Sequence, residues 1–536
     1  MSRSHRARRP RGTRRSRAVV GTVSVALLAG AAVGVGPTAH AGPTGGAPSA
    51  VTASAGLPTE VRFVDIAGHE GVRLAANVVA PADTSTSHPV LVFPTSWSMP
   101  QIEYLAQAKK LAARGYVVVS YNVRGFWESG GEIEVAGPED IADASKVIDW
   151  ALANTAADPE QIGMGGISYG AGISLLTAAA DPRVDAVAAL SGWADLVESL
   201  YSGQTQHTQA TALLTGLGYL TGRPSEETAA MMERMLSGKL DGVEEVIAWA
   251  EKRSATHQVD RLNANGTAVY LANAWGDSFF SPNQYADFYE KLSGPKRLEF
   301  RPGDHATAEG LGLLGLPNDV WTNTQRWFDH HLKGVNNGIG AEPPVRIKPR
   351  GGGAYESYSS WKDVPARSEV LDFSHNSEHI LSNGGSGAHA GISFLSNLLD
   401  QFVHTAPKAY LPLLPGHRAA KWQGDRLGTE REVRGTATVE TTVTSSHASG
   451  TAVAYLYSVS PLGFGELITH APATFHGQTP GRAFPLDIEL FATAYDVPAG
   501  HRIALVIDGV DTLYTDHNSF GQSLVFRDTE LTVPLG

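Results

Sequence analysis

The strongest constraint on the fold is the regular alternation of short apolar runs with helical stretches between residues 61 and 333. Strands that are apolar on both faces must be covered on both sides. The pattern therefore predicts an α/β fold with a mostly parallel sheet between two layers of helices. The expected strands are 72–79, 89–94, 116–121, 162–166, 184–190, 268–273 and 296–301. The expected helices are 101–114, 138–154, 170–180, 281–293 and 320–333.

One segment interrupts this alternation. Residues 196–262 lie between two expected strands and have helical patterns throughout. An insertion at that point is expected to form a helical cap over the carboxyl edge of the sheet. The side chains expected to make contacts within it are Met231, Met232, Met235, Ile247 and Trp249.

The second half of the chain has a different period. The 536 residues exceed what one hydrophobic core usually supports, so two domains are expected. After residue 340, a Gly- and Ser-rich stretch to Trp361 has the composition of a linker, and apolar residues then alternate with polar ones, as in 486–490 and 503–507. This pattern predicts a first domain at 60–340 and a β-sandwich at 341–536.

The N-terminus has the features of an export signal. Eight arginines precede an Ala/Val/Gly-rich run at 18–35, and Ala39 and Ala41 suit a cleavage site. We expect a signal peptide at 1–41, a flexible leader at 42–59 and a secreted, extracellular protein. A retained membrane anchor is the alternative, because the run is just long enough to span a bilayer. Arg14-Arg15 also leaves twin-arginine export open as the route.

The composition of the remaining chain narrows its partners. Without residues 1–41 it has 34 basic and 54 acidic residues, a net charge of −20, so we expect no nucleic-acid partner and no stable membrane association once the signal is removed. The chain has no Cys, which excludes disulfides, thiol catalysis and Cys metal sites. His and carboxylate residues show no ligand spacing, so no metal and no cofactor is expected.

The sequence Gly166-Ile167-Ser168-Tyr169-Gly170 has the form G-x-S-x-G. It follows an apolar strand and opens a helix, which is the setting of a nucleophile elbow. In that turn the Ser168 hydroxyl stands above the sheet, close to helix N–H groups that can stabilise an oxyanion. Without a base nearby, the same string would be only a Gly-rich turn with a solvated serine.

A serine nucleophile needs a histidine base and a carboxylate that orients it. In α/β-hydrolases these follow the nucleophile in the order acid, then His, after later strands. Asp277 and His305 fit this order, each just beyond an expected strand. The competing residues are Asp195, which also follows a strand, Asp304, His207 in the cap, and His330 and His331 inside a helical pattern.

An oxyanion hole requires two hydrogen-bond donors. The backbone N–H of Tyr169, directly after the nucleophile, is expected to be one of them. The second should come from the loop Thr95-Ser96-Trp97-Ser98, which follows the strand at 89–94.

Several stretches, in order along residues 60–535, resemble the Xaa-Pro dipeptidyl-peptidase and cocaine-esterase family of serine hydrolases. They are Pro89-Val90-Leu91-Val92, Val123-Arg124-Gly125, Ile148-Asp149-Trp150, the Ser168 motif, Trp275-Gly276-Asp277, Arg326-Trp327-Phe328-Asp329 and Ala499-Gly500-His501-Arg502-Ile503. The resemblance implies an α/β-hydrolase fold, a Ser168, Asp277 and His305 triad, and a C-terminal jelly roll. Trp97 stands where the family usually has a tyrosine whose hydroxyl is an oxyanion donor, and its indole N–H is the expected replacement.

The predicted reaction is acyl transfer from a short peptide or a small ester to water, by way of an acyl-enzyme. The resemblance implies a substrate preference like that of the Xaa-Pro dipeptidyl-peptidases. A dipeptidyl-peptidase must also hold a terminal ammonium, and the cap offers six glutamates for this without favouring one of them: Glu198, Glu226, Glu227, Glu233, Glu244 and Glu245. Two alternatives stay open. One is an acyl esterase without peptidase activity, and the other is a secreted carbohydrate-binding protein with an inactive hydrolase domain.

Overall fold

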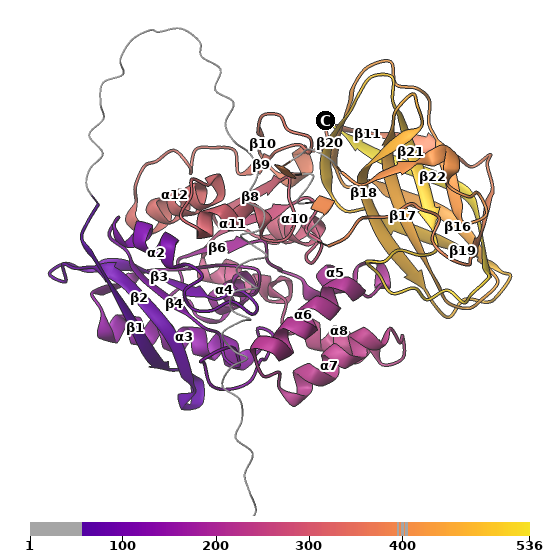
Figure 1. Cartoon of the computed structure of the whole chain (residues 1–536). Helices are drawn as coiled ribbons and strands as arrows, with labels where there is room; N and C mark the ends of the chain where they lie inside the picture. Colours follow the sequence, from indigo (N-terminus) through magenta and orange to yellow (C-terminus); the bar gives the residue numbers. More distant parts are fainter. Residues whose placement is uncertain (1–55, 394–395, 398–400, 403–405) are drawn as a thin grey trace, which may run out of the picture. The chain divides into compact units, whose positions relative to one another are not determined.

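The computed structural model describes residues 56–393, 396–397, 401–402 and 406–536. Its first part contains a ten-stranded sheet with the order β1-β2-β4-β3-β5-β6-β7-β8-β9-β10 (Figure 1). The strands are β1 (Thr59–Ala67), β2 (Arg73–Pro81), β3 (His88–Pro94), β4 (Val117–Tyr121), β5 (Ala157–Ile167), β6 (Ala186–Leu190), β7 (Ala268–Ala274), β8 (Lys296–Arg301), β9 (Val345–Ile347) and β10 (Glu356–Tyr358). Neighbours from β4 to β9 run parallel, and only the outer pairs are antiparallel. The predicted α/β-hydrolase sheet is confirmed.

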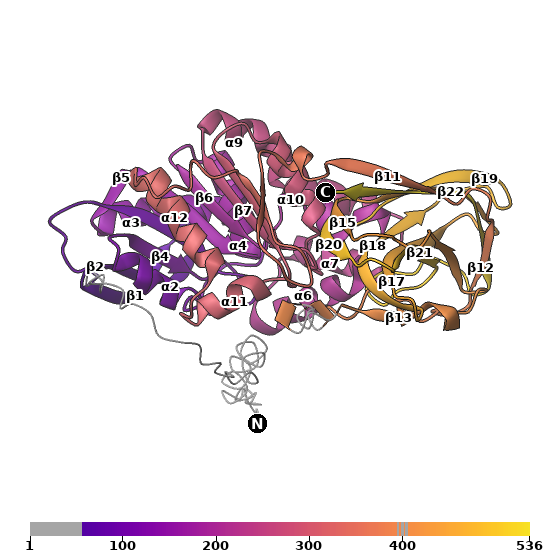
Figure 2. The same ribbon diagram turned by 90° about the horizontal axis from the view of Figure 1, so that it is seen from above.

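Helices flank the sheet on both faces (Figure 2). One layer contains α3 (Pro138–Asn154), α4 (Tyr169–Ala180) and α10 (Pro282–Lys291), and the other contains α2 (Leu105–Ala112) and α12 (Asp319–Lys333). Alternate residues of one strand supply the two cores. In β3, Val90 and Val92 belong to the core of the first layer, whereas Leu91 and Phe93 belong to that of the second. This two-sided burial explains why the strands are apolar on both faces.

The insertion between β6 and β7 is helical, as predicted. It contains α5 (Leu196–Leu200), α6 (Thr208–Thr221), α7 (Glu226–Ser237) and α8 (Val243–Glu251). The last helix of the stretch, α9 (Val259–Asn265), contributes Leu262 to the core of the sheet and is therefore part of the first helical layer. The cap proper thus ends near Glu251, before the predicted limit of 262.

The first sheet continues beyond the predicted domain boundary at residue 340. Both β9 and β10 belong to it, although they lie in the stretch expected to hold the linker. Each strand has three residues, and β10 is polar, so neither has a readable period. The signal-peptide prediction and most of the leader prediction concern residues outside the described part of the chain.

The C-terminal part forms two packed antiparallel sheets, as the period-two pattern predicts. One has the order β19-β16-β22-β15-β20, with β11 and β12 also paired to β22, and the other has the order β13-β18-β17-β21-β14. The strands are β11 (Arg367–Asp372), β12 (Glu378–Ser382), β13 (Lys408–Tyr410), β14 (Ala419–Gln423), β15 (Arg431–Gly435), β16 (Thr438–Ser445), β17 (Gly450–Val459), β18 (Phe464–Phe475), β19 (Ala483–Glu489), β20 (Thr493–Val497), β21 (Arg502–Asp508) and β22 (Gln522–Leu535). The alternating residues Leu486, Ile488, Leu505 and Ile507 lie in the core between the sheets.

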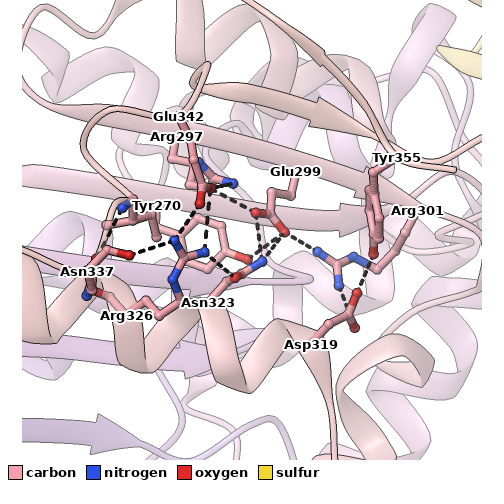
Figure 3. Close-up of polar contacts among 11 residues, drawn as sticks. Tyr270, Arg297, Glu299, Arg301, Asp319, Asn323, Arg326, Asn337, Glu342 and Tyr355 are labelled. Atoms are coloured by element: carbon pink, nitrogen blue, oxygen red, sulfur yellow. Dashed lines mark hydrogen bonds and ion pairs between the residues drawn. The ribbon is translucent and has the colours of Figure 1, made fainter. Parts of the chain in front are cut away.

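A buried ionic cluster joins β8 to its neighbours (Figure 3). The Glu299 carboxylate is fully buried, 2.8 Å from Arg297 Nε and 2.5 Å from Arg301 Nη2. Tyr270 on β7 and Asn323 on α12 donate hydrogen bonds to the same carboxylate. Because a buried charge is tolerated only with such partners, the cluster fixes β7, β8 and α12 together just before the chain leaves β8.

Candidate active site

Ser168 lies in a strained turn between β5 and α4. Its φ of 57° and ψ of −116° are rare for a residue with a side chain. The flanking glycines permit the turn. A Cβ on Gly166 would lie 2.6 Å from the Gly170 carbonyl carbon, and one on Gly170 would lie 2.2 Å from the Pro94 oxygen. The local sequence therefore forms a nucleophile elbow because only glycine fits on either side of Ser168.

The structure brings the predicted serine, histidine and aspartate together. Nε2 of His305 lies 2.9 Å from Oγ of Ser168, and Nδ1 lies 3.0 Å from Oδ2 of Asp277. Asp277 follows β7 and His305 follows β8, so both come from loops at the same edge of the sheet as the elbow. This arrangement can move a proton from the serine to the imidazole.

The Asp277 carboxylate is held from two sides. Its Oδ1 accepts hydrogen bonds of 2.9 Å from the backbone N–H groups of both Phe279 and Phe280. Burial opposes the charged imidazolium, but the nearby Asp277 carboxylate outweighs this effect, so the pKa of His305 is raised above its ordinary value. The site thus favours an imidazole that accepts a proton.

The competing residues have other partners. Asp195 is the N-cap of α5 and accepts from the N–H groups of Val197 and Glu198. His207 lies at the start of α6, and its Nε2 is 2.8 Å from Ser202 Oγ. His330 and His331 lie in the last turns of α12. Asp304 accepts through Oδ1 from the N–H groups of Ser278 and His305, and the hydrogen bonds recorded for Nδ1 of His305 join it to Asp277.

The structure contradicts the indole of Trp97 as the second oxyanion donor. The indole N–H of Trp97 donates to the carbonyl of Leu214 on α6, 2.9 Å away, so it is not available to an oxyanion. Trp97 instead packs edge-on against Tyr169. The backbone N–H of Tyr169 is at the first turn of α4, and no acceptor is recorded for it among the described residues. Tyr169 therefore keeps its predicted place, and the second donor must be sought in the backbone of the loop.

An apolar pocket with a cavity volume of about 80 Å³ opens beside Ser168. Its described lining consists of Ser168, Tyr169, Trp97, Val135, Trp193 and Phe280 together with ten cap residues, Leu196, Leu200, Thr211, Leu214, Thr215, Met231, Met232, Met235, Val246 and Trp249. None of these is Asp, Glu, Lys, Arg or His. The six glutamates that the sequence offered as ammonium ligands are not among them.

Of the cap side chains expected to make contacts, Met231, Met232, Met235 and Trp249 line this pocket, whereas Ile247 does not. Trp193 and Phe280 were missed, although both follow the ends of strands, the position from which Asp277 and His305 were identified. Within the described part of the chain, there is no group of three or more His, Cys, Asp or Glu side chains able to hold a metal ion. The same part of the chain also contains no helix of the length and apolarity that a membrane crossing requires.

Two family models match the chain. The model of the X-Pro dipeptidyl-peptidase (S15 family) matches residues 70–307, and that of the X-Pro dipeptidyl-peptidase C-terminal non-catalytic domain matches residues 337–526. A putative Xaa-Pro dipeptidyl-peptidase of Bacillus cereus is 24% identical over 467 residues, covering 79% of this chain and 76% of the relative. The cocaine esterase of a Rhodococcus species is 24% identical over 342 residues, covering 54% of this chain and 58% of the relative.

Solved structures share the architecture. An α-amino acid ester hydrolase superposes with a TM-score of 0.70 at 15% identity, covering 91% of this chain and 98% of the other. An aminopeptidase from a marine sediment archaeon, Thaumarchaeota archaeon, gives a TM-score of 0.68 at 13% identity, with coverages of 93% and 99%. At these identities the likeness shows a common fold.

Proposed function

The chain belongs to the family of serine hydrolases that includes the Xaa-Pro dipeptidyl-peptidases and cocaine esterase, and within it we propose that this enzyme is a carboxylic ester hydrolase that works through an acyl-enzyme. The observation that carries the proposal is the uncharged, apolar pocket beside Ser168. Such a surface binds a hydrocarbon acyl group and offers nothing to a charged one.

In the proposed mechanism, Ser168 Oγ attacks the ester carbonyl while His305 Nε2 takes its proton. Asp277 keeps the remaining N–H of His305 on Nδ1 and stabilises the imidazolium. The tetrahedral intermediate collapses when the imidazolium gives its proton to the leaving alcohol. Water then attacks the acyl-enzyme by the same steps, which releases the carboxylic acid and restores Ser168.

The uncharged lining of the pocket favours an ester substrate over a dipeptide substrate. A dipeptidyl-peptidase substrate carries an ammonium group, which needs a carboxylate or several acceptors when it leaves water. The described lining residues include no carboxylate, and the Tyr169 hydroxyl already donates to Asp140. The family match supports peptide cleavage as the second candidate function, with Ala-Pro and Gly-Pro termini as its substrates.

A substrate panel tests this proposal. The chain without residues 1–41 and its Ser168→Ala variant are assayed on p-nitrophenyl acetate and butyrate and on Ala-Pro and Gly-Pro anilides. We expect the highest kcat/KM on butyrate and a loss of roughly 10⁴-fold or more in the variant. A kcat/KM that is higher for the anilides would make the enzyme a peptidase. Failure of Ser168 to react with a fluorophosphonate probe would favour the carbohydrate-binding alternative.

We also propose that the enzyme acts outside the cell and on small molecules rather than on nucleic acids. Support comes from the arginine-rich start followed by an apolar run, and from the acidity of the rest of the chain. Detection of a product in the culture medium that begins near residue 42 would test export.

A further inference from the structure

The loop after β3 has few backbone N–H groups left for an oxyanion. The N–H of Thr95 donates to Tyr121, that of Ser96 donates to Glu103, and that of Met99 donates to the carbonyl of Ser96. In the trans peptide between Ser96 and Trp97, the C=O and the N–H point in opposite directions. Because Met99 holds the C=O, the N–H of Trp97 is directed to the other side, and no acceptor is recorded for it among the described residues. The placement of Ser96 therefore sets the direction of the Trp97 N–H.

Ser96 is held by a buried carboxyl group. Glu103, which is 8% exposed, accepts the Ser96 N–H through Oε2 at 2.8 Å, and its Oε1 lies 2.5 Å from Ser96 Oγ. The same Ser96 Oγ lies 3.0 Å from the carbonyl oxygen of Ile167, the residue before the nucleophile. The Ile167 N–H donates to the hydroxyl of Tyr104, which is itself 3.3 Å from Ser96 Oγ. One cluster thus joins the loop after β3 to the elbow.

The protonation state of Glu103 decides which hydrogen bonds this cluster can form. A serine hydroxyl has one proton and cannot donate fully to both Glu103 and Ile167. If Glu103 is protonated, it donates to Ser96 Oγ, and Ser96 donates to the Ile167 carbonyl, so that every donor has its own acceptor. If Glu103 is ionised, the Ser96 proton turns to the carboxylate and the bond to Ile167 is lost.

We propose that Glu103 is a positioning residue that acts as a neutral carboxylic acid and, through Ser96, fixes the loop after β3 against the nucleophile elbow. The proposal rests on the esterase function proposed above. Burial raises the pKa of the Glu103 carboxyl to about 7, although hydrogen bonds from Ser96 and Tyr104 act in the opposite direction. The titratable group facing Glu103 is Tyr104, whose ring packs against the uncharged rings of Phe93 and Trp321. Among the described residues, no charged side chain contributes to this shift.

The test is the pH dependence of kcat for p-nitrophenyl butyrate. We expect kcat of the unaltered enzyme to fall roughly threefold to tenfold above pH 7, to a lower plateau, as Glu103 ionises and the loop loosens. Glu103→Gln supplies a permanent donor to Ser96 Oγ and a permanent acceptor for its N–H, so it should keep the higher kcat and remove the alkaline decline. Ser96→Ala should show the lower kcat at every pH. In each case KM should change little, because the loop acts on the transition state.

Glu198→Gln is the matched control. The pKa of Glu198 is also raised to about 7, by burial and by Asp195, but this residue lies on α5 and outside the cluster. We expect its alkaline decline to match that of the unaltered enzyme. An unchanged decline in Glu103→Gln, or a decline removed instead by Asp140→Asn, would overturn the proposal. Ester hydrolysis that persists in Ser168→Ala would overturn the proposed function instead.

Discussion

Replacing Asp277 with asparagine should disable the enzyme while leaving its fold intact. Two backbone N–H groups donate to Oδ1 of Asp277, so the asparagine oxygen must take that place. Its NH₂ group then occupies the Oδ2 position, 3.0 Å from Nδ1 of His305. Because an amide NH₂ can only donate, Nδ1 must become the acceptor and the imidazole proton must move to Nε2. A protonated Nε2 cannot accept the proton of Ser168.

The expected loss in kcat is about 10⁴-fold, the effect of the same tautomer error in a serine protease, or about 5.4 kcal/mol in the activation barrier. The assay is hydrolysis of p-nitrophenyl butyrate, with the rate of Ser168→Ala subtracted as background. Asp195→Asn is the control, because asparagine caps a helix as well as aspartate does. It should stay within about twofold of the unaltered enzyme. A loss below tenfold in Asp277→Asn, or an equal loss in Asp195→Asn, would refute the assignment of the acid.

Three further predictions concern pH, stability and the pocket. His305 must be neutral to act, and its pKa is raised above 6.5. The acidic limb of the kcat/KM profile should therefore have its midpoint above pH 6.5, and that midpoint should move to lower pH in Asp277→Asn. A midpoint below pH 6.5 in the unaltered enzyme would contradict this. Glu299→Gln removes the buried carboxylate shared by Arg297 and Arg301, whose remaining carboxylate partners, Glu342 and Asp319, are partly exposed. It should cost about 3–5 kcal/mol in denaturant unfolding, against at most about 1 kcal/mol for the half-exposed Glu342→Gln. Equal losses would count against the cluster. Met232→Trp should fill part of the pocket and so reduce kcat/KM at least roughly tenfold for butyrate but much less for acetate. Equal losses on both esters would place Met232 away from the acyl chain.

Much of the first domain could be predicted because its strands are buried on both faces. Seven apolar runs became β2 to β8, and the residues just beyond strands β5, β7 and β8 became the candidate triad. Strand β1 could not be predicted because most of its residues are exposed. Strands β9 and β10 could not be predicted because a strand of three residues shows no period. In these strands pairing, rather than local pattern, creates the structure.

The details of the site depended on contacts between distant segments. Trp97 stands where a donor was expected, yet its indole N–H is taken by Leu214, which is 117 residues further along the chain. The composition of the cap did not indicate which of its faces turns toward Ser168, so its glutamates and its methionines were equally plausible as lining residues. The structure gives that position to the methionines.

The origin of the pocket walls has an evolutionary consequence. Ten of the sixteen described lining residues come from the insertion between β6 and β7, whereas the serine, histidine and aspartate come from the sheet and its loops. Mutations that accumulate in residues 196–251 can therefore alter which acyl group is accepted without disturbing the groups that cleave it. Proteins built on this plan can change their substrate range through substitutions in one continuous stretch of the chain, while the residues that carry out the chemistry stay the same.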